Sequence, residues 1–319
     1  MKETNYKLLV AKIKKYKNII ILKHIRPDWD AQGSSMGLAY LIQENYKGKT
    51  IVVPGDRLDD NVDFWEDNIT DKFIKSALVI IVDTATKSRL DFDRYDLAEE
   101  TFKIDHHVNI DPYAKNEIVH ETAIACTEVI TLWAEVMKLK WNSNAASNLY
   151  KGLVTDSGRF LFPNTSYKTF NAAKVLLENG ANLKQVHDSL FVSDLKRKKY
   201  ANFAFSKLQL SEKGVGHITI TKKDQKPWNY SYDEIKSALG TMSGIDEIKI
   251  WVLVIELDDE IKVSIRSRDY EIDKIANKYD GGGHKLASAC KLKALSDIDK
   301  LVKDLDKVIA KGKKKYDTK

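Results

Sequence analysis

The chain has 319 residues, of which 43% are hydrophobic and 31% are charged, and its formal net charge is +6. This length allows two domains, because single hydrophobic cores stop growing at roughly 250–300 residues. No apolar run reaches the roughly 18 residues of a membrane-spanning helix, and the Lys-rich N-terminus lacks the apolar centre of a signal peptide. We therefore expect a cytoplasmic protein without membrane contacts. Cys126 and Cys290 form no CxxC motif, which argues against a disulfide framework or a thiolate zinc site.

Short apolar runs alternate with helical patterns through the first 190 residues. Four continuous apolar runs are typical of parallel strands that are covered on both faces. These runs are residues 18–22, 50–54, 77–83 and 101–105. The segments 34–46 and 126–139 have helical periodicity. The alternation predicts an α/β fold whose first domain contains a mostly parallel sheet flanked by helices.

The segment after Val192 is charged, helical in pattern and free of proline and glycine. We therefore predict a first domain over residues 1–190, a helical linker over 191–212 and a smaller C-terminal α/β domain with a mixed sheet over 213–319. Residues 248–268 are predicted to form two strands of that sheet, joined by a turn at the sequence DDE.

Two basic segments, KRKK (196–199) and KGKKK (311–315), could contact nucleic acid. A solvated helix face and a chain terminus are the simpler explanations. The mild positive charge of the chain is compatible with an anionic partner but does not identify one.

Aspartates and histidines gather where the predicted strands end. They occur in HIRPDWD after the first strand, at the end of VIIVD, in KIDHHVN after the fourth strand, and in TDSG beyond a later apolar stretch. The residues are His24, Asp28, Asp30, Asp83, Asp105, His106, His107 and Asp156. Because ligands of open parallel sheets bind outside the carboxyl ends of the strands, we expect these groups to converge at one edge.

A single aspartate after a strand is usually a helix N-cap, and a single histidine is usually a surface or core residue. The joint pattern indicates a metal site instead, because converging carboxylates raise one another's pKa unless cations neutralise them. Four aspartates, Asp28, Asp30, Asp83 and Asp156, balance the charge of two divalent cations. Oxygen ligands with imidazole and without thiolate favour Mn²⁺, with Mg²⁺, Fe²⁺ or Co²⁺ as alternatives. Two such ions are a common device for phosphoester hydrolysis.

The Asp-His-His triplet poses a geometric question. Adjacent side chains on an extended strand point to opposite sides, which predicts that the imidazoles of His106 and His107 are splayed apart and have different roles.

The C-terminal domain contains two segments that suit a phosphate. GGGH (281–284) offers approachable backbone N–H groups and an imidazole, and VSIRSR (263–268) offers guanidinium groups for bidentate binding. Each is weak evidence alone, since most Gly-rich turns and strand arginines bind no ligand. Together with a two-metal site, they indicate a phosphorylated substrate.

These motifs, in this order, resemble the DHH phosphoesterase superfamily. HxxPDxD, a strand-end aspartate, DHH and TDSG resemble its catalytic domain, and VSIRS with GGGH resembles its DHH-associated C-terminal domain. The compact length is similar to the bacterial nanoRNase (oligoribonuclease) and pAp-phosphatase branch. The resemblance implies that residues 1–190 carry the two-metal site and that residues 213–319 bind the substrate.

The resemblance also implies a role for each residue. One metal would be held by His24 and Asp28, the other by Asp30, His106 and Asp156, and both by Asp83. His107 would face the scissile phosphate, with Asp105 orienting the histidines. The substrate-binding residues would be Arg266, Gly282, Gly283 and His284, and Arg159 is added because it lies near the site in sequence.

The implied activity is manganese-dependent hydrolysis of short oligoribonucleotides to mononucleotides and of 3′-phosphoadenosine 5′-phosphate (pAp) to AMP. The implied partners are short single-stranded RNA, with short DNA as an alternative, and nucleotide bisphosphates, and a homodimer is compatible with the resemblance. Cleavage of pApA or cyclic di-AMP is an alternative that the motifs do not separate. A pyrophosphatase or exopolyphosphatase is disfavoured because an SRKKQ-like signature is missing. A non-catalytic nucleic-acid-binding module is disfavoured because binding alone needs no such set of carboxylates.

Overall fold

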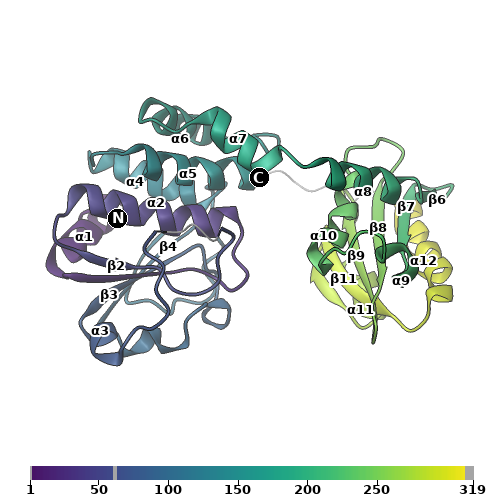
Figure 1. The fold of residues 1–319 in the computed structure, drawn as a ribbon, viewed down its shortest axis with the longest axis horizontal. Helices are drawn as coiled ribbons and strands as arrows, with labels where there is room; N and C mark the ends of the chain where they lie inside the picture. The colour runs from purple at the N-terminus through teal and green to yellow at the C-terminus, as the bar shows by residue number, and fades with distance from the viewer. Residues whose placement is uncertain (1, 60–62, 313–319) are drawn as a thin grey trace. The chain divides into compact units, whose positions relative to one another are not determined.

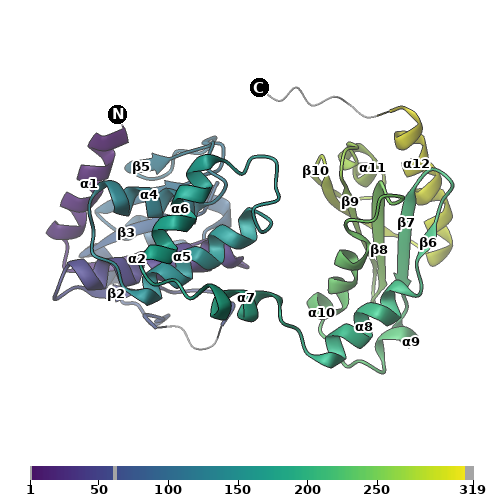
Figure 2. The same ribbon diagram turned by 90° about the horizontal axis from the view of Figure 1, so that it is seen from above.

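The computed structural model describes residues 2–59 and 63–312. The chain divides into two compact units, residues 1–192 and residues 193–319 (Figures 1 and 2). Residues 313–315 of the predicted basic tail lie outside the described residues.

The first unit is built on a five-stranded sheet in the order β2-β1-β3-β4-β5, and every pair of neighbours is parallel. The strands are β1 (Asn18–Leu22), β2 (Thr50–Val52), β3 (Ala77–Val82), β4 (Glu100–Asp105) and β5 (Asn116–Val119). The predicted α/β class with a parallel sheet is therefore confirmed. The short strand β5, at the edge of the sheet, was not predicted, because its sequence NEIV has only two apolar residues.

Helices cover both faces of this sheet, as Figure 1 shows. Alternate residues of β1 enter different cores: Ile19 and Ile21 pack in the cluster with the long helices, and Ile20 and Leu22 in the cluster on the opposite face. The helices are α1 (Lys2–Lys15), α2 (Trp29–Asn45), α3 (Asp71–Lys75), α4 (Cys126–Val136), α5 (Ser143–Asp156), α6 (Tyr167–Glu178) and α7 (Leu183–Phe191), with 3₁₀ turns η1 (Lys87–Arg89) and η2 (Asp93–Leu97).

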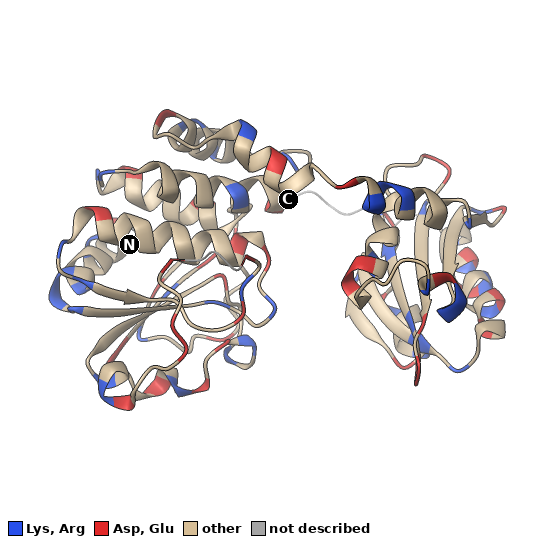
Figure 3. Ribbon diagram, viewed as in Figure 1, with Lys and Arg blue, Asp and Glu red and all other residues tan. Residues whose placement is uncertain are grey.

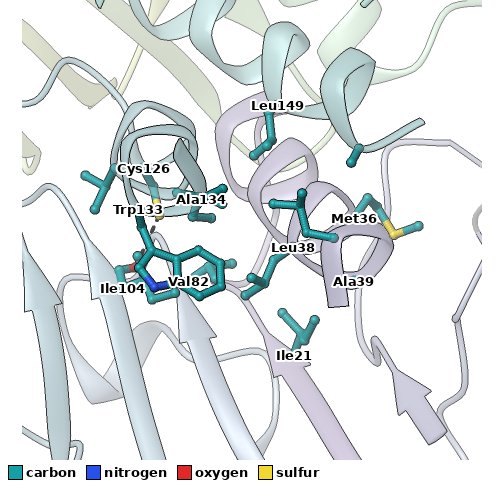
Figure 4. Packing of buried hydrophobic residues seen from close by; sticks show 14 of the residues in the cluster. Ile21, Met36, Leu38, Ala39, Val82, Ile104, Cys126, Trp133, Ala134 and Leu149 are labelled. Atoms are coloured by element: carbon teal, nitrogen blue, oxygen red, sulfur yellow. Dashed lines mark hydrogen bonds between the residues drawn. The ribbon is translucent and has the colours of Figure 1, made fainter. Parts of the chain in front are cut away.

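The main core lies between the sheet and helices α2, α4 and α5 (Figure 4). Trp133 is fully buried there, and the Cys126 thiol donates to the carbonyl of Ile104 over 3.2 Å. Both cysteines of the chain are buried and free. This packing fixes the N-terminus of α4 above the end of β4, where the predicted site residues lie.

Two expectations for the first unit were wrong. Helix α2 begins at Trp29 instead of Ser34, because the Asp28 carboxylate accepts the backbone N–H groups of Asp30 and Ala31, each over 3.0 Å, and caps the helix. Asp156 is the last residue of helix α5 and does not follow a strand. The site is therefore assembled from helix ends as well as strand ends.

The second unit contains a six-stranded mixed sheet in the order β10-β11-β9-β8-β7-β6. Strands β7 and β8 are parallel and the other pairs are antiparallel, which confirms the predicted mixed sheet. The strands are β6 (Gln209–Leu210), β7 (Val215–Ile220), β8 (Ile250–Glu256), β9 (Ile261–Ser267), β10 (Gly282–His284) and β11 (Ala287–Leu292). The helices are α8 (Leu195–Phe205), α9 (Lys222–Gln225), α10 (Tyr232–Lys236), α11 (Asp273–Lys278) and α12 (Ile298–Ala310), with 3₁₀ turns η3 (Ser237–Met242) and η4 (Leu295–Asp297).

Helix α8, with 11 residues, covers half of the segment 191–212 that was expected to be a linker. Its side chains Tyr200 and Ala204 are buried in a core cluster of the second unit, and the Tyr200 hydroxyl donates to the carbonyl of Ile235 over 2.7 Å. The helix is therefore packed onto that unit. Its KRKK side chains are exposed and form a basic segment at the start of the helix (Figure 3).

Among residues 2–59 and 63–312, no helix is long and apolar enough to span a membrane.

Candidate active site

Asp83 lies at the centre of the site, directly after β3. Its backbone adopts a left-handed conformation (φ 48°), which is uncommon outside glycine and typical of strained functional positions. One carboxylate oxygen, Oδ2, lies 3.6 Å from Nε2 of His24, and the other, Oδ1, lies 3.4 Å from Nε2 of His106. Oδ1 is buried and has no hydrogen-bond partner among the described residues. The two oxygens of Asp83 thus face two different clusters of side chains.

The first cluster consists of His24, Asp28 and Asp83, whose ligand atoms all lie within 4.8 Å of one another. Nε2 of His24 is 3.8 Å from Oδ2 of Asp28. The other oxygen of Asp28 caps helix α2, so this residue is both the helix cap that a lone aspartate suggests and a member of the cluster.

The second cluster consists of Asp30, His106 and Asp156. Nε2 of His106 lies 3.8 Å from an oxygen of each of the two carboxylates. Asp30 is fully buried and accepts the backbone N–H groups of Cys126 (2.6 Å) and Thr127 (3.0 Å) and the Thr127 hydroxyl (2.7 Å). These bonds fix the carboxylate at the N-terminus of α4, where the helix dipole favours a negative charge.

Each of the three imidazoles has its Nδ1 atom close to an oxygen acceptor. His24 Nδ1 lies 2.9 Å from the carbonyl of Ile25, His106 Nδ1 lies 3.3 Å from the carbonyl of Ala123, and His107 Nδ1 lies 2.8 Å from Oδ1 of Asp105. A proton on Nδ1 satisfies each contact and leaves a lone pair on Nε2. This arrangement is typical of histidines that bind metals through Nε2.

The structure corrects the predicted geometry of the Asp-His-His triplet. Strand β4 ends at Asp105, whose Oδ1 accepts the backbone N–H groups of His106 (2.8 Å) and His107 (3.3 Å). The chain turns around this carboxylate, so the two rings are not splayed apart. Their centroids are 4.5 Å apart, and His107 forms a third potential metal-binding group with Asp83 and His106. The alternation rule failed because it holds only while the strand continues.

The pKa values of the clustered aspartates and of His106 are shifted because these charged groups lie close together in a buried site. Burial, together with the neighbouring aspartates, raises the pKa of Asp30 to about 7 and that of Asp156 to about 9. Burial opposes the charge of His106, but the Asp83 carboxylate 3.4 Å away and the other surrounding carboxylates raise its pKa to about 10. Burial would raise the pKa of Asp83, but the adjacent imidazoles of His106 and His24 lower it below the usual value. Bound cations would relieve this repulsion.

The donors fit a pair of divalent cations. Four carboxylates and imidazole Nε2 atoms form two clusters that Asp83 links through its contact with His106, and no thiolate is among the candidate metal-binding groups of the described residues. The unpartnered buried oxygen of Asp83 supports this reading, because a buried polar atom without a partner costs free energy unless a ligand satisfies it.

Sequence reasoning missed two cationic side chains near the site. Lys103 is fully buried on β4, and its Nζ lies 2.7 Å from Oδ1 of Asn109 and 3.9 Å from Oδ2 of Asp105. It therefore balances the charge of the carboxylate that holds both histidines. A lysine inside an otherwise buried strand was the available signal. The second side chain, Arg89, lies next to His24.

The predicted substrate residues lie mostly in the second unit. Arg266 on β9 is paired with Ala287 of β11, which is paired with His284 of β10, so Arg266 and His284 flank one residue of the central strand. The Gly-rich segment is part of a strand and not a free loop. Gly283 has φ 137°, and a Cβ atom there would lie 2.6 Å from the carbonyl oxygen of Ala287, so only glycine fits.

Arg159 belongs to the first unit and is exposed. It lies in a left-handed turn with Gly158 and Phe160, and its guanidinium lies 5.2 Å from the ring centroid of Phe191. None of the contacts described for this side chain joins it to the carboxylate clusters.

A parallel α/β sheet that ends in two carboxylate–histidine clusters, followed by a mixed-sheet domain, defines the class of metal-dependent DHH phosphoesterases. The family model of the DHH N-terminal domain matches residues 18–155, and that of the DHHA1 domain matches residues 214–311. The chain belongs to the DHH family and is therefore a hydrolase.

Among its relatives is the bifunctional oligoribonuclease and PAP phosphatase NrnA of Bacillus subtilis (strain 168), which is 35% identical over 93% of this chain and 96% of the relative. A more distant relative, the cyclic-di-AMP phosphodiesterase GdpP of Geobacillus thermodenitrificans, is 26% identical over 86% of this chain and 44% of the relative. The crystal structure of an exopolyphosphatase-related protein from Bacteroides fragilis has the same fold, with a TM-score of 0.84, 19% identity and coverage of 97% and 96% of the two chains.

Proposed function

We propose that this protein hydrolyses short oligoribonucleotides to mononucleotides and pAp to AMP, with two divalent cations, preferably Mn²⁺. The observation that carries the proposal is the pair of carboxylate–histidine clusters joined by Asp83. The relation to NrnA, which spans nearly the whole of both chains, supports the choice of substrate.

In this proposal, His24 and Asp28 hold one cation, Asp30, His106 and Asp156 hold the other, and Asp83 binds both. The cations, when bound, supply an activated water and neutralise charge on the phosphate oxygens. Manganese suits this set of oxygen and imidazole ligands.

His107 is the side chain proposed to contact the scissile phosphate. Its Nδ1 lies 2.8 Å from Asp105 and its imidazole is partly exposed, so Nε2 can meet a substrate oxygen. A protonated imidazole in this position stabilises the charge that develops on the phosphate in the transition state. Asp105 orients the ring through its contact with Nδ1.

In the second unit, Arg266, Gly282, Gly283 and His284 are proposed to bind a substrate phosphate other than the one that is cleaved. The fork of a guanidinium suits the bidentate binding of phosphate, and the backbone near Gly283 can be approached closely.

Cleavage of pApA or cyclic di-AMP is the second candidate, favoured by the match to GdpP. This candidate activity ranks second because GdpP is less similar to the chain than NrnA is, and because the match covers only 44% of GdpP. Rates on pAp, a 5′-labelled trinucleotide, pApA and cyclic di-AMP in Mn²⁺ would rank the two. Higher kcat/KM on pApA than on pAp and the trinucleotide would overturn the first.

Replacing the shared carboxylate tests the two-metal assignment. Asp83→Asn should lower kcat on every substrate by at least roughly 10³-fold, because it removes a charged group from both clusters. Asp71→Asn is the matched control, since Asp71 forms an exposed ion pair with Arg94. Near wild-type turnover of Asp83→Asn in Mn²⁺ would refute the assignment.

A further inference from the structure

Arg89 is fixed beside the first carboxylate–histidine cluster by its backbone. It ends the 3₁₀ turn η1, which follows Asp83, and its carbonyl accepts the N–H of Ile25 over 2.8 Å. The next residue, Leu90, forms an antiparallel bridge with His24. The position of Arg89 is therefore tied to a proposed metal ligand.

Within the described part of the chain, the guanidinium of Arg89 has no carboxylate acceptor to match its charge. One of its nitrogens, Nη2, lies 3.3 Å from Nδ1 of His24, but that Nδ1 atom also lies 2.9 Å from the carbonyl of Ile25. If Nδ1 carries its proton toward Ile25, it has no lone pair for Arg89, because a guanidinium only donates. No carboxylate of the described residues forms an ion pair with Arg89, although Asp28 and Asp83 both surround His24.

A neighbouring arginine shows the contrast. Arg94 on η2 donates to Asp71 over 2.7 Å and to the carbonyl of Ile69 over 2.9 Å, so its charge serves the local structure. Arg89 is exposed and has no such pair, so its donors are available to a ligand.

The charge of the site favours an anionic ligand for Arg89. Two divalent cations would neutralise Asp28, Asp30, Asp83 and Asp156, and a bound phosphate would then add uncompensated negative charge. Guanidinium groups bind phosphate oxygens with strong, charge-assisted hydrogen bonds.

We propose that Arg89 binds a phosphate group of the substrate next to the metal centre. This inference rests on the proposed function and adds a substrate-binding residue in the first unit to those proposed in the second.

The test compares Arg89→Gln, Arg89→Lys and the control Arg94→Gln as full-length, Mn²⁺-loaded proteins with pAp. Loss of a charge-assisted contact should lower kcat/KM of Arg89→Gln roughly 10- to 100-fold. Arg89→Lys should recover part of the loss, and Arg94→Gln should stay within roughly twofold of the wild type. Bound manganese, measured per chain, should be the same in all four proteins.

Two results would overturn the proposal. One is an unchanged kcat/KM of Arg89→Gln. The other is loss of bound manganese from Arg89→Gln, which would make Arg89 a support for His24 and not a substrate ligand.

A separate binding measurement distinguishes failure of this inference from failure of the proposed function. If the wild type hydrolyses none of the panel, the proposed function fails. Calorimetric titration of inorganic phosphate into Mn²⁺-loaded protein still tests Arg89. A Kd that is at least roughly 10-fold weaker in Arg89→Gln than in the wild type supports the inference, and equal Kd values contradict it.

Discussion

At the scale of single residues, the site depends on carboxylates whose two oxygens have different partners. In Asp28, one oxygen caps helix α2 and the other faces His24. In Asp83, the two oxygens face His24 and His106. In Asp105, one oxygen holds both histidine N–H groups and the imidazole of His107, and the other lies 3.9 Å from buried Lys103. A small number of aspartates can therefore build both the local backbone structure and the site.

The two histidines of the triplet should respond differently to substitution. His106→Ala should lower the bound metal per chain, because Nε2 of His106 faces three carboxylates. His107→Ala should keep most of the metal and lower kcat by roughly 10²-fold or more, as expected for a group that stabilises transition-state charge. Metal analysis and steady-state kinetics on both variants check this. Because the rings are only 4.5 Å apart, equal metal loss in both variants is the outcome that would assign His107 to a metal.

The crowded charges predict a pH dependence of stability in the metal-free protein. The pKa of Asp156 is raised from 3.8 to about 9, so the folded protein holds a proton that the unfolded chain releases, and stability falls as the pH rises. The pKa of His106 is raised from 6.5 to about 10, so its contribution is complete below about pH 6.5 and is lost as the pH rises through 10. The lowered pKa of Asp83 acts only in acid, below its unfolded value of 3.8.

The raised pKa values of Asp156 and His106 both predict a Tm that decreases between about pH 7 and 9 in a chelator. Thermal unfolding at the two pH values would measure this change. Saturating Mn²⁺ should raise the Tm most at the higher pH, where the ligands are deprotonated. Asp156→Asn should flatten the pH dependence, whereas a Tm that rises with pH in the chelator would contradict the charge assignment.

At the scale of secondary-structure elements, close helix packing positions the second cluster. Helices α2 and α5 pack side by side, and α5 delivers Asp156 while the first turn of α2 delivers Asp30. Gly152 makes the approach possible, because a Cβ atom there would lie 2.5 Å from Cγ2 of Thr127 and 2.8 Å from Oδ1 of Asp30. The geometry of the site is therefore coupled to the packing of three helices.

Gly152→Ala should disturb both stability and metal binding. We expect the free energy of unfolding to fall by about 1–3 kcal/mol, because the added methyl group overpacks a buried helix contact. We also expect weaker Mn²⁺ binding, since the methyl group displaces Asp30. Gly240→Ala is the control, because a Cβ atom there would meet nothing within 4 Å. Denaturant unfolding and metal titration provide the two measurements. Unchanged metal affinity in Gly152→Ala would show that the site tolerates movement of α5.

At the scale of the whole molecule, the chain divides into two units with separate cores. The large cluster around Trp133 belongs to the first unit, and the clusters around Val252 and Tyr200 belong to the second. The carboxylate–histidine clusters and the proposed phosphate-binding residues Arg266 and His284 are thus held by different units. Metal binding and substrate binding should be separable by mutation.

Arg266→Ala tests this separation. We expect KM for pAp to increase roughly 10-fold or more, while bound manganese stays at the wild-type level, because the lost contact is a charge-assisted phosphate bond. Arg268→Ala is the matched control: its guanidinium donates to the carbonyl of Ile245 and is exposed. A fall in bound metal without a change in KM would contradict the division of roles.

Much of the architecture was predictable from the sequence, because it depends on local patterns. Continuous apolar runs predicted the central strands, and the change of pattern after Val192 predicted a second domain with a mixed sheet. Because strands β1, β3 and β4 are parallel, the residues that follow them had to meet at one edge. The convergence of His24, Asp83 and His106 was therefore accessible from this pattern, whereas Asp156 reaches the site from the end of helix α5.

Other features depended on contacts between segments that are distant in sequence. The start of α2 was missed because its cap, Asp28, was interpreted as a metal ligand in preference to a helix N-cap. The two histidine rings lie close together because Asp105 binds both backbone N–H groups, which ended the strand one residue before His106. A lysine inside a buried strand marked Lys103 as unusual, but its contact with Asp105 and that of Arg89 with His24 could be identified only in three dimensions.

The sequence by itself determined the chemical inventory and its order, because residue types and strand periodicity are local properties of the chain. Only the tertiary structure decided which oxygen of each carboxylate faces which imidazole. It also decided which cationic side chains of the described residues have no carboxylate partner. Those decisions rest on distances of 3–4 Å between segments up to about a hundred residues apart, which packing sets and local pattern does not.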